Sequence, residues 1–570
     1  MFKGLKTKIA FVLLVSFILT LINTGNSQQP DVFVIAIPAD PENLCQALHT
    51  SSYSAPVAGG VFNSLCSYSR EPMFELKPDL AKSWEISADK MNFTFYLRDD
   101  VYWHDGVKFT SADVKYTIEE ISSLHHPHLR SQLKNLLRVD TPDEYTASIL
   151  LTEPNPDLVI YLACAMELAV QPKHLYEGTD PLTNEYNAKP VGTGPYMFKE
   201  WIKGERIVLE KNPNYFIEGL PHFDRVNILI ISDDFARVSA LEKGEIDYIP
   251  APFFPISEYV RLKEDPNIVI SDKGYEAVAN ERWLALNLRE MHLKDLRVRQ
   301  ALAHAINRDE LSELAGYGLN PPTYGYVTKE SIWYNPAAAE LMPKYDPDKA
   351  EALLDEAGYP RGTDGVRFTL RITFESLTEV LKTMEVVADQ WKEVGVNVQL
   401  RALERVTALD EVYNQWDFDV WVIPGKSTGP TFSILASIFL SSSIKKGLLW
   451  GNNMGYSNPR VDELFNLLPL ETNTTVRESY VDEIQEIITK DLPVIPLWQV
   501  SKLSAWREGL VDLPVEIYVW GAWAGIGNTL RLPSPTDSEG ELPIELIVLV
   551  VVAFILTILV IYVVMRRKKK

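Results

Sequence analysis

Apolar residues change from a helical to an alternating spacing at several glycines along the chain. In the stretch DDFARVSALEKGEIDYI, Phe235, Val238 and Leu241 share one helical face, Gly244 ends the helix, and an apolar stretch follows at 246–249. A helix followed by a strand is the repeating unit of α/β proteins. This stretch therefore predicts one such unit.

The same order recurs in the second half of the chain. In EVLKTMEVVADQWKEVGVNVQLRAL, Gly395 separates a helical pattern from the alternating residues 396–403. In YDPDKAEALLDEAGY, Asp346 is placed to cap a helix, Pro347 to occupy its first position and Gly358 to follow its end. YMFKEWIKGERIVLEK instead pairs two apolar-rich runs around a Lys-Gly turn, which predicts a hairpin. We therefore expect an α/β protein with mixed sheets.

Both ends of the chain have the composition of membrane-directed segments. Residues 1–27 combine a lysine-rich start, a short apolar run and a small polar exit, which predicts a signal peptide, with an uncleaved N-terminal anchor as the alternative. Residues 544–565 predict one transmembrane helix, and the basic tail at 566–570 favours the cytoplasmic side. Residues 533–543 are rich in Pro, Ser and acids and predict a tether. The body at 28–532 is therefore expected outside the cell.

Composition fits an ordinary globular ectodomain. The 570 residues are 46% hydrophobic and 23% charged, and roughly 500 residues between the ends are enough for two or three domains. The net charge is -22, and eight basic residues at the two ends leave about -30 on the rest, which argues against nucleic acid as a partner. The cysteines are Cys45, Cys66 and Cys164, and a Cys45–Cys66 disulfide is possible in this compartment.

Reaction motifs are mostly missing. The sequence has no GxSxG, no HExxH, no CxxC and no phosphate loop ending in GK[ST]. HHPHLR, at 125–130, is the one histidine cluster, but Pro127 interrupts it, which favours a polar loop over a metal site. His304 lies among alanines and is expected in the core. The sequence therefore predicts neither an enzyme nor a cofactor.

The stretch VYWHDGVKFTSADV places His104 beside Asp105 before a turn glycine. Neighbouring side chains in an extended or turning chain point in different directions, so this pair is interpreted as structural and not catalytic. Thr110 and Asp113 have the spacing of a capping box that starts a helix.

The residues around that stretch resemble a known family. LKPDLAKSWEISADKMNFTFYLRDDVYWHDGVKFTSADV is similar to the family 5 extracellular solute-binding proteins, the dipeptide and oligopeptide receptors of ABC importers. The likeness continues through VGTGPYMFKEW, EKNPNYF, ALEKGEIDYI, LNLREMHLKDLRVRQALAHAINRDEL, YDPDKAEALLDEAGY, GYSNPRVDELF and EIQEIITKDLPVIPLWQ. It covers nearly the whole expected ectodomain in order.

The resemblance implies a periplasmic-binding-protein type 2 fold, in which two lobes enclose a ligand cleft and a further domain is added. The implied segments are lobe I at 29–64, 192–280 and 500–532, an extra domain at 65–191, and lobe III at 281–499. It also implies closure on a ligand, delivery to a permease with its ATPase subunits, and a monomer. The C-terminal helix would replace a lipid anchor, as in archaeal-type envelopes.

One loop departs from the family pattern. Peptide-binding members typically follow the strand that corresponds to DFDVWV with a loop that carries Asp immediately before Pro, and that carboxylate holds the peptide ammonium. Here the loop reads PGKSTGPTF, with Gly429 at that place. An ammonium left unpaired in a closed cleft is expensive, whereas tryptophan faces suit sugar rings. The expected ligand contacts are Trp416, Trp421, Lys426, Thr428 and Trp498.

The sequence thus predicts a membrane-tethered receptor that captures oligopeptides or, as the alternative, oligosaccharides. Other classes left open are a tail-anchored secreted hydrolase, a surface protein that lost transport, and a receptor for a metal chelate such as nickel.

Overall fold

The computed structural model describes residues 31–49, 51–68, 75–163, 165–272, 280–423, 431–510, 516–518 and 521–523. The predicted signal peptide, tether, transmembrane helix and basic tail lie outside these residues. Within the described part of the chain, no helix is both long enough and apolar enough to cross a bilayer.

A seven-stranded mixed sheet forms the first body, with strand order β12-β18-β11-β1-β10-β9-β8. Its strands come from three separate parts of the chain: β1 (Val32–Ile37), β8 (Tyr196–Ile202), β9 (Arg206–Lys211), β10 (Arg225–Ile230), β11 (Tyr248–Ile249), β12 (Ile268–Ser271) and β18 (Ser504–Arg507). β1 runs parallel to β10 and β11, whereas β8, β9 and β10 are antiparallel neighbours. We call this part the seven-stranded body.

A five-stranded sheet forms the second body, with strand order β15-β14-β16-β13-β17. Its strands are β13 (Glu281–Leu286), β14 (Phe368–Glu375), β15 (Val396–Leu403), β16 (Val420–Ile423) and β17 (Val494–Gln499). The surrounding helices are α10 (Leu296–His304), α11 (Arg308–Gly316), α12 (Pro336–Leu341), α13 (Pro347–Glu356), α14 (Thr378–Glu393), α15 (Arg405–Leu409), α16 (Ala436–Phe439), α17 (Pro459–Leu467) and α18 (Thr474–Asp491). We call this part the five-stranded body.

A third, antiparallel sheet has the order β4-β5-β7-β6. Its strands are β4 (Ala81–Ile86), β5 (Asn92–Leu97), β6 (Leu136–Asp143) and β7 (Thr146–Leu151). Its helical elements include α3 (Ser111–Tyr116), the π-helical turn η3 (Thr117–Ser122), α5 (Leu129–Gln132), α6 (Leu158–Tyr161) and α7 (Lys173–Tyr176). This four-stranded domain has an apolar core of its own.

Most local predictions are confirmed. Gly395 has φ +83 and separates α14 from β15, and Asp346 caps α13 by accepting from the backbone N–H of Lys349. Gly244 ends α8 (Asp234–Lys243) with φ +73. One prediction for this helix is wrong, because Phe235 is 69% exposed and does not share the buried face.

The HDG stretch is structural, as predicted. His104 Nε2 lies 2.9 Å from the carbonyl oxygen of Gly194, while Asp105 Oδ2 pairs with His174 Nε2 at 2.7 Å, so the two neighbours point to different partners. Thr110 and Asp113 form the predicted capping box at the start of α3. The predicted Cys45–Cys66 disulfide is wrong, because both thiols are free and buried in different cores.

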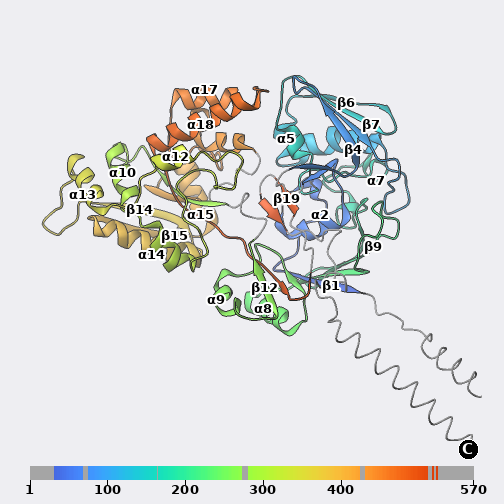
Figure 1. Ribbon diagram of the computed structural model, residues 1–570, viewed down its shortest axis with the longest axis horizontal. Coiled ribbons are helices and arrows are strands. Elements are labelled where there is room, and N and C mark those ends of the chain that lie inside the picture. The colour runs from blue at the N-terminus through green and yellow to red at the C-terminus, as the bar shows by residue number, and fades with distance from the viewer. Residues whose placement is uncertain are drawn as a thin grey trace, which may run out of the picture.

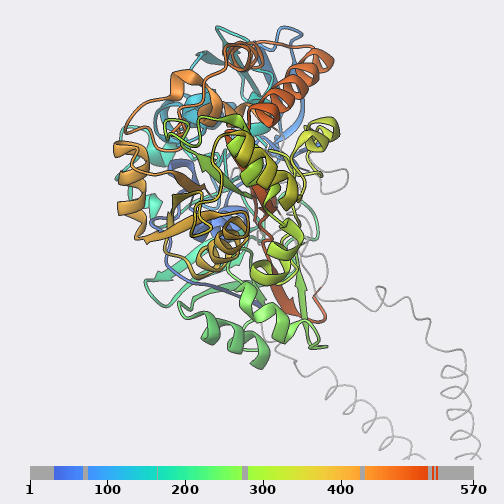
Figure 2. The same ribbon diagram turned by 90° about the vertical axis from the view of Figure 1, so that its left-hand side faces the viewer.

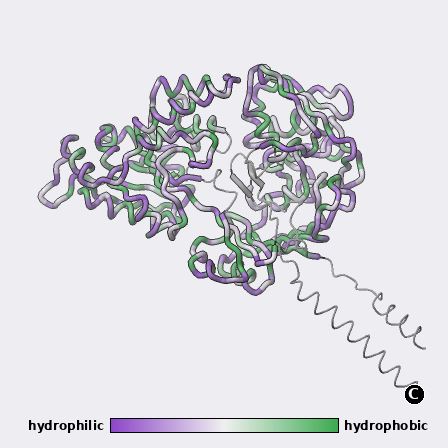
Figure 3. The backbone as a smooth tube through the Cα atoms, viewed as in Figure 1, coloured by the Kyte–Doolittle hydropathy of each residue, from purple (hydrophilic) through white to green (hydrophobic). Residues whose placement is uncertain are grey.

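The two bodies lie side by side, with the four-stranded domain on the side of the seven-stranded body (Figure 1). The chain leaves the seven-stranded sheet after β12 and enters the five-stranded sheet at β13, and it returns between β17 and β18. There the N–H of Val500 donates to the carbonyl of Asn280 at 2.7 Å. Figure 2 shows the same bodies from the side, and in Figure 3 the hydrophobic stretches lie mainly within each body. Two adjacent crossings between two bodies are the arrangement of a hinge.

Candidate functional site

Strand direction defines two edges of the five-stranded sheet. β14 is parallel to β15 and β16, and β13 is antiparallel to β16 and β17. We call the edge where β14 to β17 end and β13 begins the carboxyl edge, and the opposite edge the amino edge. Both crossings to the seven-stranded body leave from the carboxyl edge, at residues 280 and 500. In open α/β sheets, ligands bind outside the carboxyl ends of the strands.

A buried arginine and an exposed glutamate form the first ion pair at the carboxyl edge. Arg282 is 9% exposed, and its Nη2 donates to Glu379 Oε1 at 2.9 Å, while the side chain of Glu379 is 51% exposed. Burial lowers the pKa of Arg282, and Glu379 and Glu375 raise it in part. The pair therefore joins a fixed cation to a carboxylate that is open to solvent.

A second ion pair lies beside it with the opposite distribution of exposure. Arg405 Nη1 donates to both carboxylate oxygens of Glu375 at 2.8 Å. Here the arginine side chain is 57% exposed and the glutamate 15% exposed. The carboxyl edge thus presents to solvent one accessible anion and one accessible cation, each neutralised within the protein.

A narrow crevice of about 10 Å³, room for at most one water molecule, is shared by the two bodies at this edge. Its wall includes Ile256 from the seven-stranded body and Arg282, Ala315, Asn320, Glu379, Thr383, Trp498 and Val500. Trp498 is paired with Arg282 across β13 and β17. The first ion pair and one predicted ligand residue therefore line the same interbody crevice.

Glu281 is a fully buried acid at the start of β13. Its two carboxyl oxygens accept from Trp283 Nε1 and from Thr323 Oγ1, each at 2.9 Å. Burial raises the pKa of Glu281 to about 8. This carboxyl is therefore largely protonated at neutral pH, beside the hinge.

The amino edge holds a different group of charges. The guanidinium carbon of Arg289 lies 3.8 Å from the ring centroid of Trp416, and the Nζ of Lys446 lies 5.2 Å from it. Trp416 precedes β16 and has φ +63. Its ring therefore contacts two cations of its own body at the end of β16 opposite the carboxyl edge.

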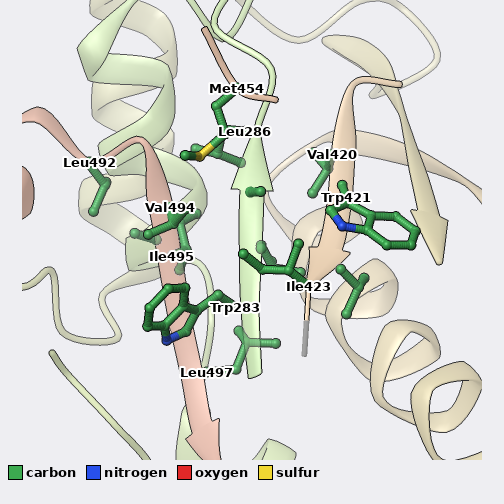
Figure 4. Packing of buried hydrophobic residues seen from close by; sticks show 14 of the residues in the cluster. Trp283, Leu286, Val420, Trp421, Ile423, Met454, Leu492, Val494, Ile495 and Leu497 are labelled. Carbon is green, nitrogen blue, oxygen red and sulfur yellow. The ribbon is translucent and has the colours of Figure 1, made fainter. Parts of the chain in front are cut away.

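The structure does not bring all predicted ligand residues together. Both Trp498 and Trp421 belong to the core of the five-stranded body, but Trp498, 3% exposed, also lines the interbody crevice. Trp421 is fully buried and points away from β13 in Figure 4. Trp416 lies at the other end of the sheet. Lys426 and Thr428 lie outside the described residues, so their role stays a prediction.

The histidine cluster is partly a core feature, and the expectation of a polar loop is therefore only partly right. His126 is fully buried, and its Nδ1 accepts from the backbone N–H of His128 and of Leu129. His128 Nδ1 lies 3.2 Å from Glu167, a partner distant in sequence. In the part of the chain that the structure describes, no three His, Cys, Asp or Glu side chains are placed to hold a metal ion.

Sequence reasoning missed the charged residues of the carboxyl edge. Arg282 is the second residue of β13, Glu375 ends β14, and Glu379 and Arg405 lie in the first turns of the helices that follow β14 and β15. The sequence did contain a signal for Arg405, because this residue follows the predicted strand at 396–403 by two residues. Their assembly could not be found without the strand order.

Comparison with known proteins connects this geometry to a family. The family described as bacterial extracellular solute-binding proteins, family 5 Middle, matches residues 75–446. A Brucella ovis protein named as an ABC transporter peptide-binding protein is 30% identical over 458 residues, covering 78% of this chain and 81% of that protein. The glutathione-binding protein GsiB of Escherichia coli K12 is 27% identical over 496 residues, covering 84% and 90%.

Solved structures show the same fold. NikZ from Campylobacter jejuni, in complex with Ni(L-His), has a TM-score of 0.69 and 26% identity, and the alignment covers 86% of this chain and 97% of that one. The oligopeptide-binding protein AppA from Bacillus subtilis, in complex with a nonapeptide, has a TM-score of 0.65 and 25% identity, with the same coverage. These likenesses identify the architecture as α/β and similar to the periplasmic binding proteins.

Proposed function

The chain belongs to family 5 of the bacterial extracellular solute-binding proteins, and from this premise we propose that it captures oligopeptides for import. At the coarser level it is a solute-binding receptor of the ABC-importer type, whose relatives are named as binding proteins and not as enzymes. The proposal concerns the ligand, the residues that hold it and the attachment of the receptor to the membrane.

The pair of Arg–Glu contacts at the carboxyl edge is the observation that carries the peptide proposal. A peptide with free ends carries one ammonium and one carboxylate, whereas a neutral sugar carries neither. Glu379 and Arg405 are the exposed members of their pairs, so each can bind a peptide terminus while its buried partner stays in place. Gly429 stands where related peptide receptors carry a carboxylate before proline, and Glu379 supplies one from a different element.

Of the aromatic residues predicted to contact the ligand, Trp498 is best placed, because it lines the crevice that contains Arg282 and Glu379. Lys426 and Thr428 remain part of the proposal because they follow β16 directly in the sequence, and β16 ends at the carboxyl edge. Trp421 would reach a ligand only after a change in packing, and Trp416 is at the opposite edge, so we rest no part of the site on these two.

Ligand capture would occur by closure of the two bodies about their adjacent crossings. A peptide that contacts both bodies binds the closed state more tightly than the open state. This difference in binding free energy is the most by which the peptide can shift the equilibrium between the two states. The closed form would then be recognised by a permease with cytoplasmic ATPase subunits.

The sequence supports an extracellular, membrane-tethered receptor. Residues 1–27 would direct export, residues 533–543 would hold the body away from the bilayer, and the single span at 544–565 would anchor it with residues 566–570 in the cytoplasm. Tethering of this kind raises the local concentration of a receptor at its transporter.

Thermal unfolding of the full chain against matched panels of peptides and oligosaccharides tests the ligand class. A ligand at 100 times its dissociation constant adds about 2.7 kcal/mol of stability, so peptides with free termini are expected to raise the unfolding temperature. A rise with oligosaccharides alone would reject the peptide proposal. It would favour the sugar alternative, for which the missing aspartate before Pro430 is the specific sequence argument.

A further inference from the structure

A buried polar contact joins the four-stranded domain to the five-stranded body. Asp157 Oδ1 accepts from Arg477 Nη2 at 2.5 Å, and Asp157 Oδ2 accepts from Ser433 Oγ at 2.9 Å. Arg477 belongs to α18 and Ser433 to the 3-10 turn η8 (Phe432–Leu435), so both donors come from the other body. The side chain of Asp157 is 5% exposed and that of Arg477 is 10% exposed.

A second pair extends this contact by one helical turn. Tyr161, at the end of α6, places its hydroxyl 3.5 Å from the hydroxyl of Thr431, and both residues are almost completely buried. On the opposite side, the guanidinium of Arg477 lies 5.6 Å from the ring centroid of Trp333, within its own body. The arginine is therefore held in place by its own body and reaches Asp157 across the interface.

The contact lies far from the two crossings. In Figures 1 and 2, α18 and the four-stranded domain both lie at the top of the molecule, whereas β12, which precedes the first crossing, lies at the bottom. Rotation about the crossings separates residues at the far end the most. Opening of the two bodies would therefore break the Asp157 contacts first.

The geometry points to a latch: Asp157, held by Arg477 and Ser433, keeps the four-stranded domain against the five-stranded body when the protein is closed. This inference rests on the proposed function, since it concerns closure around the ligand. The ion pair is shielded from water only while the bodies touch, and both ions regain hydration when the bodies part. Its net contribution is then moderate, which suits a reversible contact.

Loss of the latch lowers the fraction of protein in the closed form. The apparent dissociation constant rises by the same factor as that fraction falls, and we expect about a tenfold rise for Asp157→Ala. Arg477→Ala should have a similar effect. The double variant should have a dissociation constant no higher than that of the weaker-binding single variant, because both substitutions break the same interaction.

The test measures the distance between the bodies without ligand. Spin labels at Leu137→Cys in β6 and Leu470→Cys beyond α17, both exposed positions, report that distance by pulsed electron resonance in the full-length chain. A Cys164→Ser background removes one native thiol, and the other two are buried. We expect longer distances in Asp157→Ala and in Arg477→Ala than in the parent protein. If either alanine variant fails to fold, Asp157→Asn takes its place in the experiment. This variant keeps the shape of the side chain and should show the same increase in distance.

Glu411→Gln is the matched control. It weakens the 2.8 Å ion pair with Arg401 inside the five-stranded body, so it should leave the interbody distance unchanged. Unchanged distances in folded Asp157 and Arg477 variants, or an equal shift in the control, would overturn the latch. Failure of every peptide to bind would reject the proposed function instead, while the ligand-free distances would still decide the latch.

Discussion

The carboxyl and amino edges of the five-stranded sheet both carry arginines and acids, yet they use them differently. At the carboxyl edge, Glu379 and Arg405 are more than half exposed beside a crevice that the seven-stranded body helps to form. At the amino edge, Arg289 and Lys446 contact the ring of Trp416, and Arg371 pairs with Asp417 and Asp419, all within one body.

The difference lies in what each edge faces. Charges at the amino edge serve the stability of a single body, whereas charges at the carboxyl edge stand where two bodies close. Nearness in sequence to a predicted ligand loop is therefore a poor guide, because Trp416 lies at the amino edge, whereas the four-residue strand β16 that follows it ends at the carboxyl edge.

The largest expected effect concerns pH and Glu281, at the carboxyl edge. Its folded-state pKa of about 8 lies above the usual value of 4.5, so the folded protein retains a proton that the unfolded chain releases. The stabilisation is fully present below about pH 4.5 and is lost as pH rises through 8, on the order of a few kcal/mol. Chemical denaturation from pH 5 to 8 should show this decline in the parent protein and a flatter profile in Glu281→Gln.

Glutamine is the informative replacement because it resembles the protonated acid. It retains one oxygen to accept from Trp283 and one N–H group to donate to the hydroxyl of Thr323. Parallel pH profiles for the two proteins would show that Glu281 is ionised in the folded state.

Arg282, at the start of β13, and Arg289, three residues after its end, provide the next test. Arg282→Ala removes the buried cation that holds Glu379 in place and lines the crevice beside Trp498, so peptide affinity should fall about 100-fold. Arg289→Ala should reduce thermal stability while affinity stays within about twofold, since its contacts lie within the amino edge. Isothermal titration with one tripeptide measures the affinity of both variants, and thermal unfolding measures the stability of Arg289→Ala. Equal losses of affinity in the two variants would abolish the distinction between the edges.

Exposed acids give a matched pair with a smaller effect. Glu379 and Asp417 are 51% and 53% exposed, and each pairs with one arginine, at 2.9 and 2.7 Å. Glu379→Gln should weaken binding of a free-amino peptide about tenfold and should not affect its N-acetylated form. Asp417→Asn should change neither affinity. If acetylation of the peptide and the Glu379 substitution weaken binding by amounts that add, Glu379 does not hold the ammonium.

The smallest effect is expected from the tryptophans. Trp498→Phe should weaken peptide binding about threefold by removing part of the aromatic surface of the crevice wall. Trp416→Phe should leave affinity unchanged and lower stability by about 0.5–1 kcal/mol through weaker cation–π contacts. Fluorescence-monitored titration and thermal unfolding measure these values, and a reversed order of affinities would move the ligand to the amino edge.

Local structure could be predicted from the sequence because its causes are local. Asp346 caps its helix, Gly395 has a positive φ, and Thr110 with Asp113 closes a capping box, each within a few residues of the chain. The helix–glycine–strand pattern also gave the α/β class, and the family resemblance gave the receptor function at the coarser level.

The charged edge and the interbody contact could not be predicted in the same way. Arg282 and Glu379 are 97 residues apart, and Asp157 and Arg477 are 320 apart, so only the strand order and the packing of the bodies bring them together. The predicted disulfide failed for a related reason, because Cys45 and Cys66 are close in sequence but belong to different cores.

A crystal structure of the full chain with a bound tripeptide tests the central claim most directly. We expect the peptide between the two bodies at the carboxyl edge, with its ammonium within hydrogen-bonding distance of Glu379 and its carboxylate near Arg405. A peptide bound at the amino edge beside Trp416, or a carboxyl edge that keeps both ion pairs and contacts no ligand, would contradict the account.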